Sequence, residues 1–354
     1  MNKNKQENNK PYFTLSKKVI FDQFDKVKDL CDVVSYSSKT NPLVTKILEE
    51  KKDCLFSVHL KNELKNIIDK KRVLFLAQAL EEDFIDELMN EGINKFVIDN
   101  LEDLEILLSY LNKNKDKKID LMLRVKLKEN SIRTERYFVF GISSDIVNEK
   151  ILELRKNKQI NDLGVHFHRK SQNMAEWNLI EELNDMFSKE TLKDIDTINI
   201  GGGLPSIYAN TNEKIFDSIY KKILEFKEYI NKKNIKLMIE PGRFIAAPAG
   251  KLHSKIIQIY ENNIILNVSV YNTDMDALIV PVKLLVKGEL NQNDENAKPF
   301  VIKGKTPCSM DLFRYRVYLN NPKKNDEIVF LNAGAYNFTT DFCDLEKLEQ
   351  IIVD

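Results

Sequence analysis

Short β-type runs alternate with amphipathic helical patterns between residues 33 and 243, and this alternation limits the folds that the chain can adopt. The β-type runs number eight and start at residues 33, 54, 72, 95, 119, 163, 196 and 236. Segments such as LEEDFIDELMNEG and KIFDSIYKKILEFKEYI separate them, with apolar residues at helical spacing. Eight strand–helix units of this length predict a closed (β/α)8 TIM-like barrel, with an open doubly wound sheet as the alternative.

The periodicity changes to two after residue 251, in runs such as IILNVSVY and EIVFLNAGAY, which predicts an all-β domain after the barrel. We therefore expect a disordered tail at 1–11, a strand and helix at 12–30, the barrel at 31–250 and the β domain at 251–354. The strand at the start of 12–30 has no partner in the barrel pattern, so we expect it to join the β domain.

Composition excludes several classes of function. The 354 residues include 54 Lys and Arg and 54 Asp and Glu, which are interspersed along the chain, so nucleic acid is not an expected partner. The four cysteines show neither a metal-like spacing nor a disulfide framework. We find no signal peptide and no long apolar run, so we expect a cytoplasmic protein with no metal and no membrane partner.

Reactive residue types follow the predicted barrel strands, where the active sites of such barrels lie. Lys39 follows the first run, Arg124 lies in the fifth and His168 closes the sixth. Glu240 and Arg243 follow the eighth. An amine beside a carboxylate in a barrel mouth suggests a Schiff base with an aldehyde cofactor, while a solvated lysine is the alternative. His168 is either a hydrogen-bonded core histidine or a ring above a flat cofactor.

Three consecutive glycines, Gly201, Gly202 and Gly203, follow the seventh run. Glycine lets backbone N–H groups approach an anion, and the loops after strands seven and eight of such barrels often hold a phosphate. Because Arg243 in the next loop adds charge and two donors, the pattern favours a phosphate site over a tight structural turn.

Taken together, these motifs resemble the fold-type III pyridoxal phosphate-dependent decarboxylases, a group that includes ornithine, diaminopimelate, arginine and carboxynorspermidine decarboxylases. VVSYSSKTNP is similar to the family's YAVKANP segment, GVHFHRKS to GVSFHVGS, EPGRF to EPGR and NAGAYNF to GAGAY. The resemblance implies pyridoxal 5'-phosphate as the cofactor and the alanine racemase-like fold, a barrel followed by a β domain. It also implies a homodimer with shared active sites.

The resemblance assigns roles to single residues. It makes Lys39 the Schiff-base lysine, His168 the ring that stacks on the cofactor, and Glu240 the partner of the pyridine nitrogen. The other cofactor contacts that it implies are Arg124, Ser171, Gly201, Gly202, Gly203, Gly242, Arg243 and Tyr336. A carboxylate at position 240 favours decarboxylation, because it keeps the pyridine nitrogen protonated. Alanine racemases carry an arginine there and resemble this chain less.

The stretch GKTPCSMD, residues 304–311, departs from the family patterns GPTCDSxD and GPxCESxD, because the acidic residue beside the cysteine is lost. The donor of the proton to the substrate Cα is therefore open among Cys308, His168 and Lys39. Two neighbours of His168, Arg169 and Lys170, are expected on the loop surface, and the alternative is that they bind an acidic group of an unusual substrate. His59, near the end of the second run, has no counterpart that we find in the family pattern.

The far end of the substrate is indicated less directly. Diaminopimelate enzymes usually carry an arginine at the position of Val280, which counts against that substrate. Asp274, Asp276 and Asp311 are candidates to bind a distal amine, and the alternative is that they cap turns.

We therefore expect a decarboxylase that removes the α-carboxylate of a basic, diamino or polyamine-like, L-amino acid, with ornithine favoured and polyamine biosynthesis as its pathway. The alternatives are a diaminopimelate decarboxylase of lysine biosynthesis and a carboxynorspermidine decarboxylase. A different class, a non-catalytic paralogue that binds a partner protein, is motivated by the altered GKTPCSMD stretch.

Overall fold

The structure is a computed structural model that describes residues 10–127, 139–337 and 339–354. The chain divides into two compact units. The barrel unit consists of Phe24–Pro205 and Lys214–Gly242, and the β unit consists of Met1–Gln23, Ser206–Glu213 and Arg243–Asp354.

The barrel unit is built on a closed, parallel, eight-stranded barrel in which the strands follow one another in chain order. Each of the eight predicted β-type runs contributes one strand, so the prediction of a (β/α)8 barrel is confirmed. The strands are β2 (Val33–Ser37), β3 (Leu55–Val58), β4 (Val73–Ala77), β5 (Lys95–Ile98), β6 (Ile119–Arg124), β7 (Ile160–His166), β8 (Thr197–Asn199) and β9 (Lys236–Ile239).

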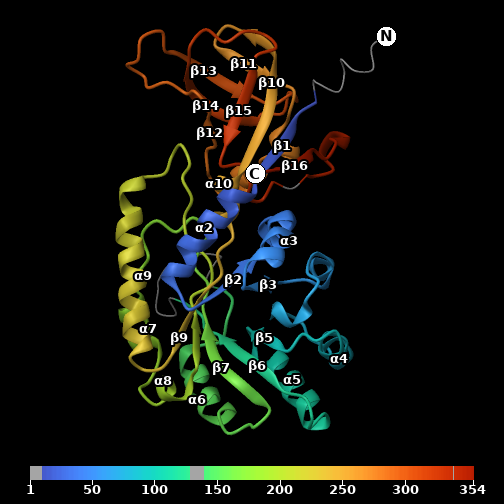
Figure 1. Cartoon of the computed structure of the whole chain (residues 1–354), viewed down its shortest axis with the longest axis vertical. Coiled ribbons are helices and arrows are strands. Elements are labelled where there is room, and N and C mark those ends of the chain that lie inside the picture. The colour runs from blue at the N-terminus through green and yellow to red at the C-terminus, as the bar shows by residue number, and fades with distance from the viewer. Residues whose placement is uncertain (1–9, 128–138, 338) are drawn as a thin grey trace. The chain divides into compact units, whose positions relative to one another are not determined.

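Helices flank the barrel strands (Figure 1). The helices that the barrel unit contains or shares are α2 (Lys17–Leu30), α3 (Pro42–Lys51), α4 (Glu82–Asn90), α5 (Leu101–Lys113), α6 (Ser144–Leu154), α7 (Leu179–Met186), α8 (Thr191–Asp194) and α9 (Phe216–Asn231). In α9 the buried residues are Ile219, Ile223, Phe226 and Ile230, which repeat at intervals of three and four and form one face. Asn100 caps α5 by accepting a hydrogen bond from the backbone N–H of Asp103.

Short 3-10 helices complete the connections, and they are η2 (Ser38–Thr40), η3 (Lys61–Asn66), η4 (Lys70–Arg72) and η6 (Glu213–Ile215). Between β3 and β4 the chain forms η3 and η4 and no α-helix, which differs from the expected strand–helix alternation. The Glu49 carboxylate accepts hydrogen bonds from the backbone N–H groups of Ile68 and Asp69, so this connection is held by a side chain of α3.

The interior of the barrel holds a cluster of buried apolar side chains from β4, β5, β6 and β9, namely Leu74, Val97, Met122 and Met238. Val33, Leu55 and Leu76 pack against this cluster. Residues of this type fill the interior of eight-stranded barrels, so the barrel is a packed core.

The β unit contains the strands β1 (Tyr12–Ser16), β10 (Gly250–Tyr260), β11 (Asn263–Leu266), β12 (Leu285–Val286), β13 (Lys298–Lys303), β14 (Leu312–Leu319), β15 (Glu327–Leu331) and β16 (Glu349–Val353). The order of the main path is β12-β15-β10-β11-β13-β14. β1 pairs with β10 in the antiparallel and with β16 in the parallel direction (Figure 1). The remaining elements are α10 (Arg243–Ala249), α11 (Asp276–Ile279), η7 (Val270–Asn272) and η8 (Phe342–Asp344).

This second unit is mostly sheet, which confirms the predicted combination of a barrel with a β domain. Among the described residues, none of the helices combines the length and the apolar character that spanning a bilayer requires.

Truncation of the barrel core should destabilise the barrel unit. Leu74 is 1% exposed, and we expect Leu74→Ala to lower the free energy of unfolding by about 2–5 kcal/mol. Trp177 is the single tryptophan of the sequence and is buried in the barrel unit, so its fluorescence during urea unfolding reports on this unit. Leu224→Ala is the control, because Leu224 is 46% exposed, and its effect should stay within about 0.5 kcal/mol. Equal losses in the two variants would contradict the assignment of Leu74 to the core.

Candidate functional site

The carboxyl ends of the barrel strands bring several predicted site residues to one end of the barrel. Lys39 lies in η2 directly after β2, Arg124 ends β6, His168 follows β7, and Glu240 follows β9. Parallel strands in a closed barrel all end at the same rim, so these side chains gather there although they are far apart in sequence.

Glu240 is the acid of this group, and its side chain is buried, with an exposed fraction of 3%. Asn199 Nδ2 donates a hydrogen bond to Glu240 Oε1 at 2.9 Å, and His166 Nε2 lies 3.5 Å from Oε2. Burial acts to raise the pKa of Glu240, but His166, His168 and the Asn199 amide outweigh it, so the pKa lies below its ordinary value. The carboxylate is therefore ionised at neutral pH.

No sequence motif assigns a role to His166 or Asn199. Both end a barrel strand, β7 and β8 respectively, and both side chains are buried beside Glu240. Their position at strand ends is the signal that would have identified them.

The glycine loop after β8 packs against His168. The backbone N–H of Gly202 lies 3.3 Å from His168 Nδ1 and donates to it. Gly201 has a φ of +65°, and a Cβ there would lie 2.6 Å from the carbonyl oxygen of Phe167. The same Cβ would lie 2.8 Å from His168 Nδ1, so this glycine makes room for the histidine and its backbone.

His168 is a neutral imidazole at neutral pH. Burial lowers its pKa to about 3, although the charge of Glu240 acts in the opposite direction. Because Nδ1 accepts from Gly202, the ring hydrogen belongs on Nε2. The stacking of this ring on a cofactor, and the binding of phosphate by Gly201, Gly202 and Gly203, remain predictions.

Gly242 supports the segment that carries Lys39. A Cβ at Gly242 would overlap Thr40 Oγ1 and approach Ser37 Cβ to 3.2 Å. The backbone N–H of Ser37 donates to the carbonyl of Pro241 at 3.0 Å. The end of β2 is therefore joined to the segment after β9, and the glycine allows close contact between the two.

Lys39 is exposed, and its Nζ lies 3.2 Å from His59 Nε2. His59 directly follows β3, the strand next to β2, so two neighbouring strand ends carry the two residues. The sequence pattern places His59 near the end of a strand but gives it no role in the site. Contact with Lys39 depends on strand register, which composition and periodicity do not specify.

Arg243 and Tyr336 lie in a cluster within the β unit. Arg243 is 3% exposed, and its guanidinium pairs with both carboxylate oxygens of Asp276. It also donates to the Tyr208 hydroxyl at 2.9 Å, and its central carbon lies 5.0 Å from the Tyr336 ring centroid. The contacts of Arg243 and Tyr336 with phosphate remain predictions.

Two of the acids expected to bind a distal amine lie in this cluster. Asp276 has Arg243 as its partner, so the structure lends no support to a role of Asp276 in amine binding. Asp274 is buried, and burial together with the nearby Asp276 raises its pKa well above the ordinary value. A raised pKa favours the protonated, neutral form of the carboxyl group. A neutral carboxyl group binds an ammonium less well than a carboxylate does.

Asp311, the third acid, has structural partners for both oxygens. Oδ1 accepts from the backbone N–H of Val270 at 2.8 Å. Oδ2 accepts from the backbone N–H and the hydroxyl of Thr306, at 3.0 and 2.7 Å. These bonds organise the turn that precedes β14, which agrees with the alternative that the aspartates cap turns.

Cys308 lines a pocket of about 470 Å³ in the β unit, together with Thr306 and Asp311. Its Sγ lies 3.0 Å from the Tyr271 hydroxyl, and this hydrogen bond lowers the pKa of the thiol. The role of Cys308 in proton return remains a prediction.

The expectation that Arg169 lies on the loop surface is wrong. Arg169 is 2% exposed and pairs with Glu182, and its guanidinium lies near the Phe167 and Trp177 rings. A planar guanidinium can stack on aromatic rings while it pairs with a carboxylate, which is why this residue is buried. Lys170 is partly buried, and so is Ser171, whose predicted contact with phosphate is untested.

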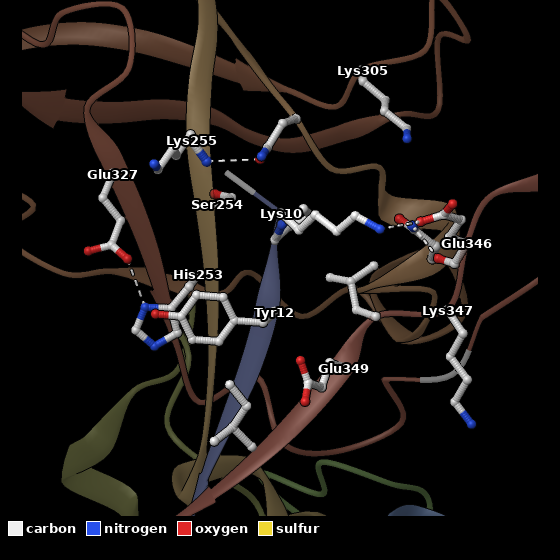
Figure 2. Close-up of a pocket in the computed structure, with 15 residues that line it drawn as sticks. Lys10, Tyr12, His253, Ser254, Lys255, Lys305, Glu327, Glu346, Lys347 and Glu349 are labelled. Carbon is white, nitrogen blue, oxygen red and sulfur yellow. Dashed lines mark hydrogen bonds and ion pairs between the residues drawn. The ribbon is translucent and has the colours of Figure 1, made fainter. Parts of the chain in front are cut away.

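A larger pocket of about 900 Å³ lies in the β unit beside β1, β10 and β16 (Figure 2). Two pairs of lining side chains are in contact: His253 Nδ1 lies 2.9 Å from Glu327 Oε1, and Lys10 Nζ lies 3.8 Å from Glu346 Oε2. The Tyr12 ring stacks on His253 (Figure 2). None of the predicted site residues is among the described residues that line this pocket.

Residues 18–247 match the family model of the pyridoxal-dependent decarboxylases, pyridoxal binding domain. The chain belongs to this family. It is a decarboxylase of amino acids, and its cofactor is pyridoxal phosphate, as the sequence motifs predicted.

Two curated relatives of this decarboxylase are similar to it over most of their length. A diaminopimelate decarboxylase from Bacteroides thetaiotaomicron is 23% identical over 92% of this chain and 90% of its own. A probable ornithine decarboxylase from Dictyostelium discoideum is 23% identical over 93% of this chain and 76% of its own.

Solved structures share the fold. The lysine/ornithine decarboxylase from Vibrio vulnificus, complexed with cadaverine, has a TM-score of 0.79 and is 21% identical, over 98% of this chain and 95% of its own. Diaminopimelate decarboxylase from Helicobacter pylori, complexed with L-lysine, has a TM-score of 0.78 and is 18% identical, over 98% and 92% of the two chains.

The barrel residues fit pyridoxal phosphate. Among the described residues, no lysine or arginine forms an ion pair with the buried Glu240 carboxylate, which is thus free for a cationic ring N–H. Lys39 offers an exposed amine to an aldehyde, and His168 offers a neutral ring of suitable shape.

The contact between the glycine loop and His168 can be measured by a pair of substitutions. Gly288 has a φ of +77°, and a Cβ added there would meet no atom within 4 Å, so Gly288→Ala should cost only the strain of a left-handed backbone, about 1–2 kcal/mol. Gly201→Ala has similar strain and a steric overlap, and should cost at least about 1 kcal/mol more. Free energies of unfolding from urea titrations test this, and equal losses would show that the overlap is relieved without cost.

Removal of Asp276 should leave the Arg243 charge buried without its partner. We expect Asp276→Ala to lower the free energy of unfolding by about 3–5 kcal/mol. The control is Glu153→Ala, which removes an exposed ion pair with Lys150 and should change stability by less than about 0.5 kcal/mol. Similar results in the two variants would contradict the buried pair.

Proposed function

We propose that this chain removes the α-carboxylate of an L-amino acid that carries a distal amino group, and that ornithine is its preferred substrate. The observation that carries the proposal is Glu240, a buried and ionised carboxylate at the barrel rim that has no lysine or arginine ion-pair partner among the described residues. The family supplies the reaction class, and the motif resemblance supplies the preference for ornithine.

Three residues of the barrel unit have separate roles in the proposed reaction. Bound pyridoxal phosphate supplies an aldehyde that reacts with amines and a ring that takes up electrons. Lys39 provides the amine that holds the cofactor between turnovers. Glu240 keeps a proton on the ring nitrogen, because a negative charge at hydrogen-bonding distance raises the pKa of that nitrogen. His168 presents the flat face of a neutral imidazole and excludes water from one side.

The distal group of the substrate distinguishes two candidates. Val280 stands where a diaminopimelate enzyme usually carries an arginine, which supports a distal amine over a distal carboxylate. Diaminopimelate decarboxylase is the second candidate, because relatives from Bacteroides thetaiotaomicron, Methanocaldococcus jannaschii and Campylobacter jejuni carry that name. Carboxynorspermidine is a third substrate worth testing.

The proposal extends to the oligomeric state, the cellular location and the pathway of the protein. We propose a homodimer with shared active sites, in the cytoplasm and in polyamine biosynthesis, with the division of the chain into tail, barrel and β domain given above. The support is the family membership and the resemblance of the motifs. The altered GKTPCSMD stretch motivates the opposing hypothesis of a non-catalytic paralogue.

A substrate panel separates these hypotheses. The purified, pyridoxal phosphate-loaded protein is incubated separately with L-ornithine, L-lysine, L-arginine, meso-diaminopimelate and carboxynorspermidine, and CO2 release is measured. Release from ornithine or lysine supports the proposal. Release from meso-diaminopimelate alone transfers the assignment to the second candidate, and no release from any of the five contradicts both.

Glu240→Gln tests the central residue. The variant keeps the shape and loses the negative charge, so we expect kcat to fall by about 10²-fold or more while the visible absorbance of the bound cofactor persists. Lys39→Ala should lose that absorbance, because the covalent bond to the cofactor is gone. Glu228→Gln on the exposed face of α9 is the matched control and should retain wild-type kcat. An unchanged kcat in Glu240→Gln would contradict the role of Glu240.

A further inference from the structure

The register of β2 and β3 places His59 beside Lys39. Ser37 pairs with Ser57 in the parallel ladder, and Lys39 and His59 each lie two residues beyond this pair. The two side chains therefore leave neighbouring strands at the same level of the barrel rim, and Lys39 Nζ lies 3.2 Å from His59 Nε2. This contact follows from the register of two neighbouring barrel strands.

The local backbone holds His59 in this place. Glu63 Oε1 accepts hydrogen bonds from the backbone N–H groups of His59 and Leu60, at 2.9 and 3.0 Å. The other ring nitrogen, Nδ1, is buried and has no hydrogen-bond partner among the described residues. The imidazole therefore has Lys39 as the partner of its ring nitrogens within the described part of the chain.

The charge state of His59 follows from its surroundings. Burial lowers the pKa of His59 to about 3, and the positive charge of Lys39 acts in the same direction. The other groups that act on His59 and Lys39 are Glu63 in η3, Arg124 from β6, His166 from β7, His168 and Glu240. At neutral pH the imidazole is uncharged, so Nε2 accepts from Lys39 and Nδ1 carries the hydrogen.

A neutral acceptor and a carboxylate have different effects on a lysine. Both hold the amine in place, but a carboxylate at this distance stabilises the ammonium form and raises the pKa of the lysine. An imidazole that stays neutral orients Nζ and adds no such charge. The amine must lose its extra proton before it can attack an aldehyde, so the difference affects the chemistry of Lys39.

We propose that His59 is a positioning residue for Lys39, whose neutral imidazole orients Nζ toward the cofactor aldehyde and adds no countercharge that would retain the ammonium form. This inference rests on the proposed role of Lys39. In the step that it assists, the ammonium releases one proton to solvent and the free amine forms a bond to the aldehyde carbon. The aldehyde oxygen then leaves as water with the two remaining hydrogens of the amine, and a C=N bond remains.

The test measures the capture of pyridoxal phosphate by the cofactor-free protein as a function of pH, followed by visible absorbance. His59→Glu introduces a carboxylate, and we expect the pH midpoint of the capture rate to rise by about 1–3 units. His59→Gln keeps a neutral acceptor and should retain the wild-type midpoint. His59→Leu has no acceptor, so its rate should fall about two- to tenfold, the size of one neutral hydrogen bond, while its midpoint does not rise.

The outcomes distinguish three explanations. An unchanged midpoint in His59→Glu, or wild-type rates in His59→Leu, would overturn the role of His59. Thermal melting of each variant is measured in parallel, and a fall in capture that follows the loss of melting temperature in all three variants would show a merely structural role. Capture with the wild-type spectrum by Lys39→Ala would instead contradict the proposed function, whatever the His59 variants do.

Discussion

The pairing of β2 with β9 closes the barrel, and the positions of the candidate site residues follow from this closure. Val33 and Val34 pair with Met238 and Ile239, and the contact continues past the strand ends, where Ser37 donates to the carbonyl of Pro241. Glu240 lies between these two connections. Without the closing pair, Lys39 and Glu240 would belong to opposite edges of an open sheet, so closure makes an amine and a carboxylate neighbours at one rim.

Two buried carboxylates show how their partners determine their roles. Asp276 in the β unit forms an ion pair with the guanidinium of Arg243, so its negative charge is balanced by a residue of the same chain. Glu240 in the barrel unit has a neutral amide donor and a nearby imidazole, and no cationic arginine or lysine partner among the described residues. Burial of an ionised group costs several kcal/mol unless charge and hydrogen bonds offset it. A cofactor with a cationic ring nitrogen supplies what the Glu240 site lacks.

Much of the barrel was predictable from the sequence, because each strand is a short apolar run and the runs are separated by helical patterns. The predicted site residues at strand ends, such as Lys39 and Glu240, also lie where barrel topology requires. The burial of Arg169 was not predictable, since it depends on the pairing with Glu182 and on the Trp177 ring. The contacts of Asp276 with Arg243 and of Asp311 with Val270 were not predictable either, because contacts between residues distant in sequence leave no periodic signal.

The pairing of β1 bears on the order in which the chain is made and folds. β1 contains Tyr12–Ser16, but its partners are β10, which starts at Gly250, and β16, which ends at Val353. The barrel strands pair with neighbours in chain order, so they can associate while the chain is being synthesised. Both hydrogen-bonding edges of β1 stay open until β10 has emerged, and one of them stays open until β16 has emerged. During synthesis β1 is therefore a strand with unpaired edges, which can pair with another chain until β10 and β16 cover it.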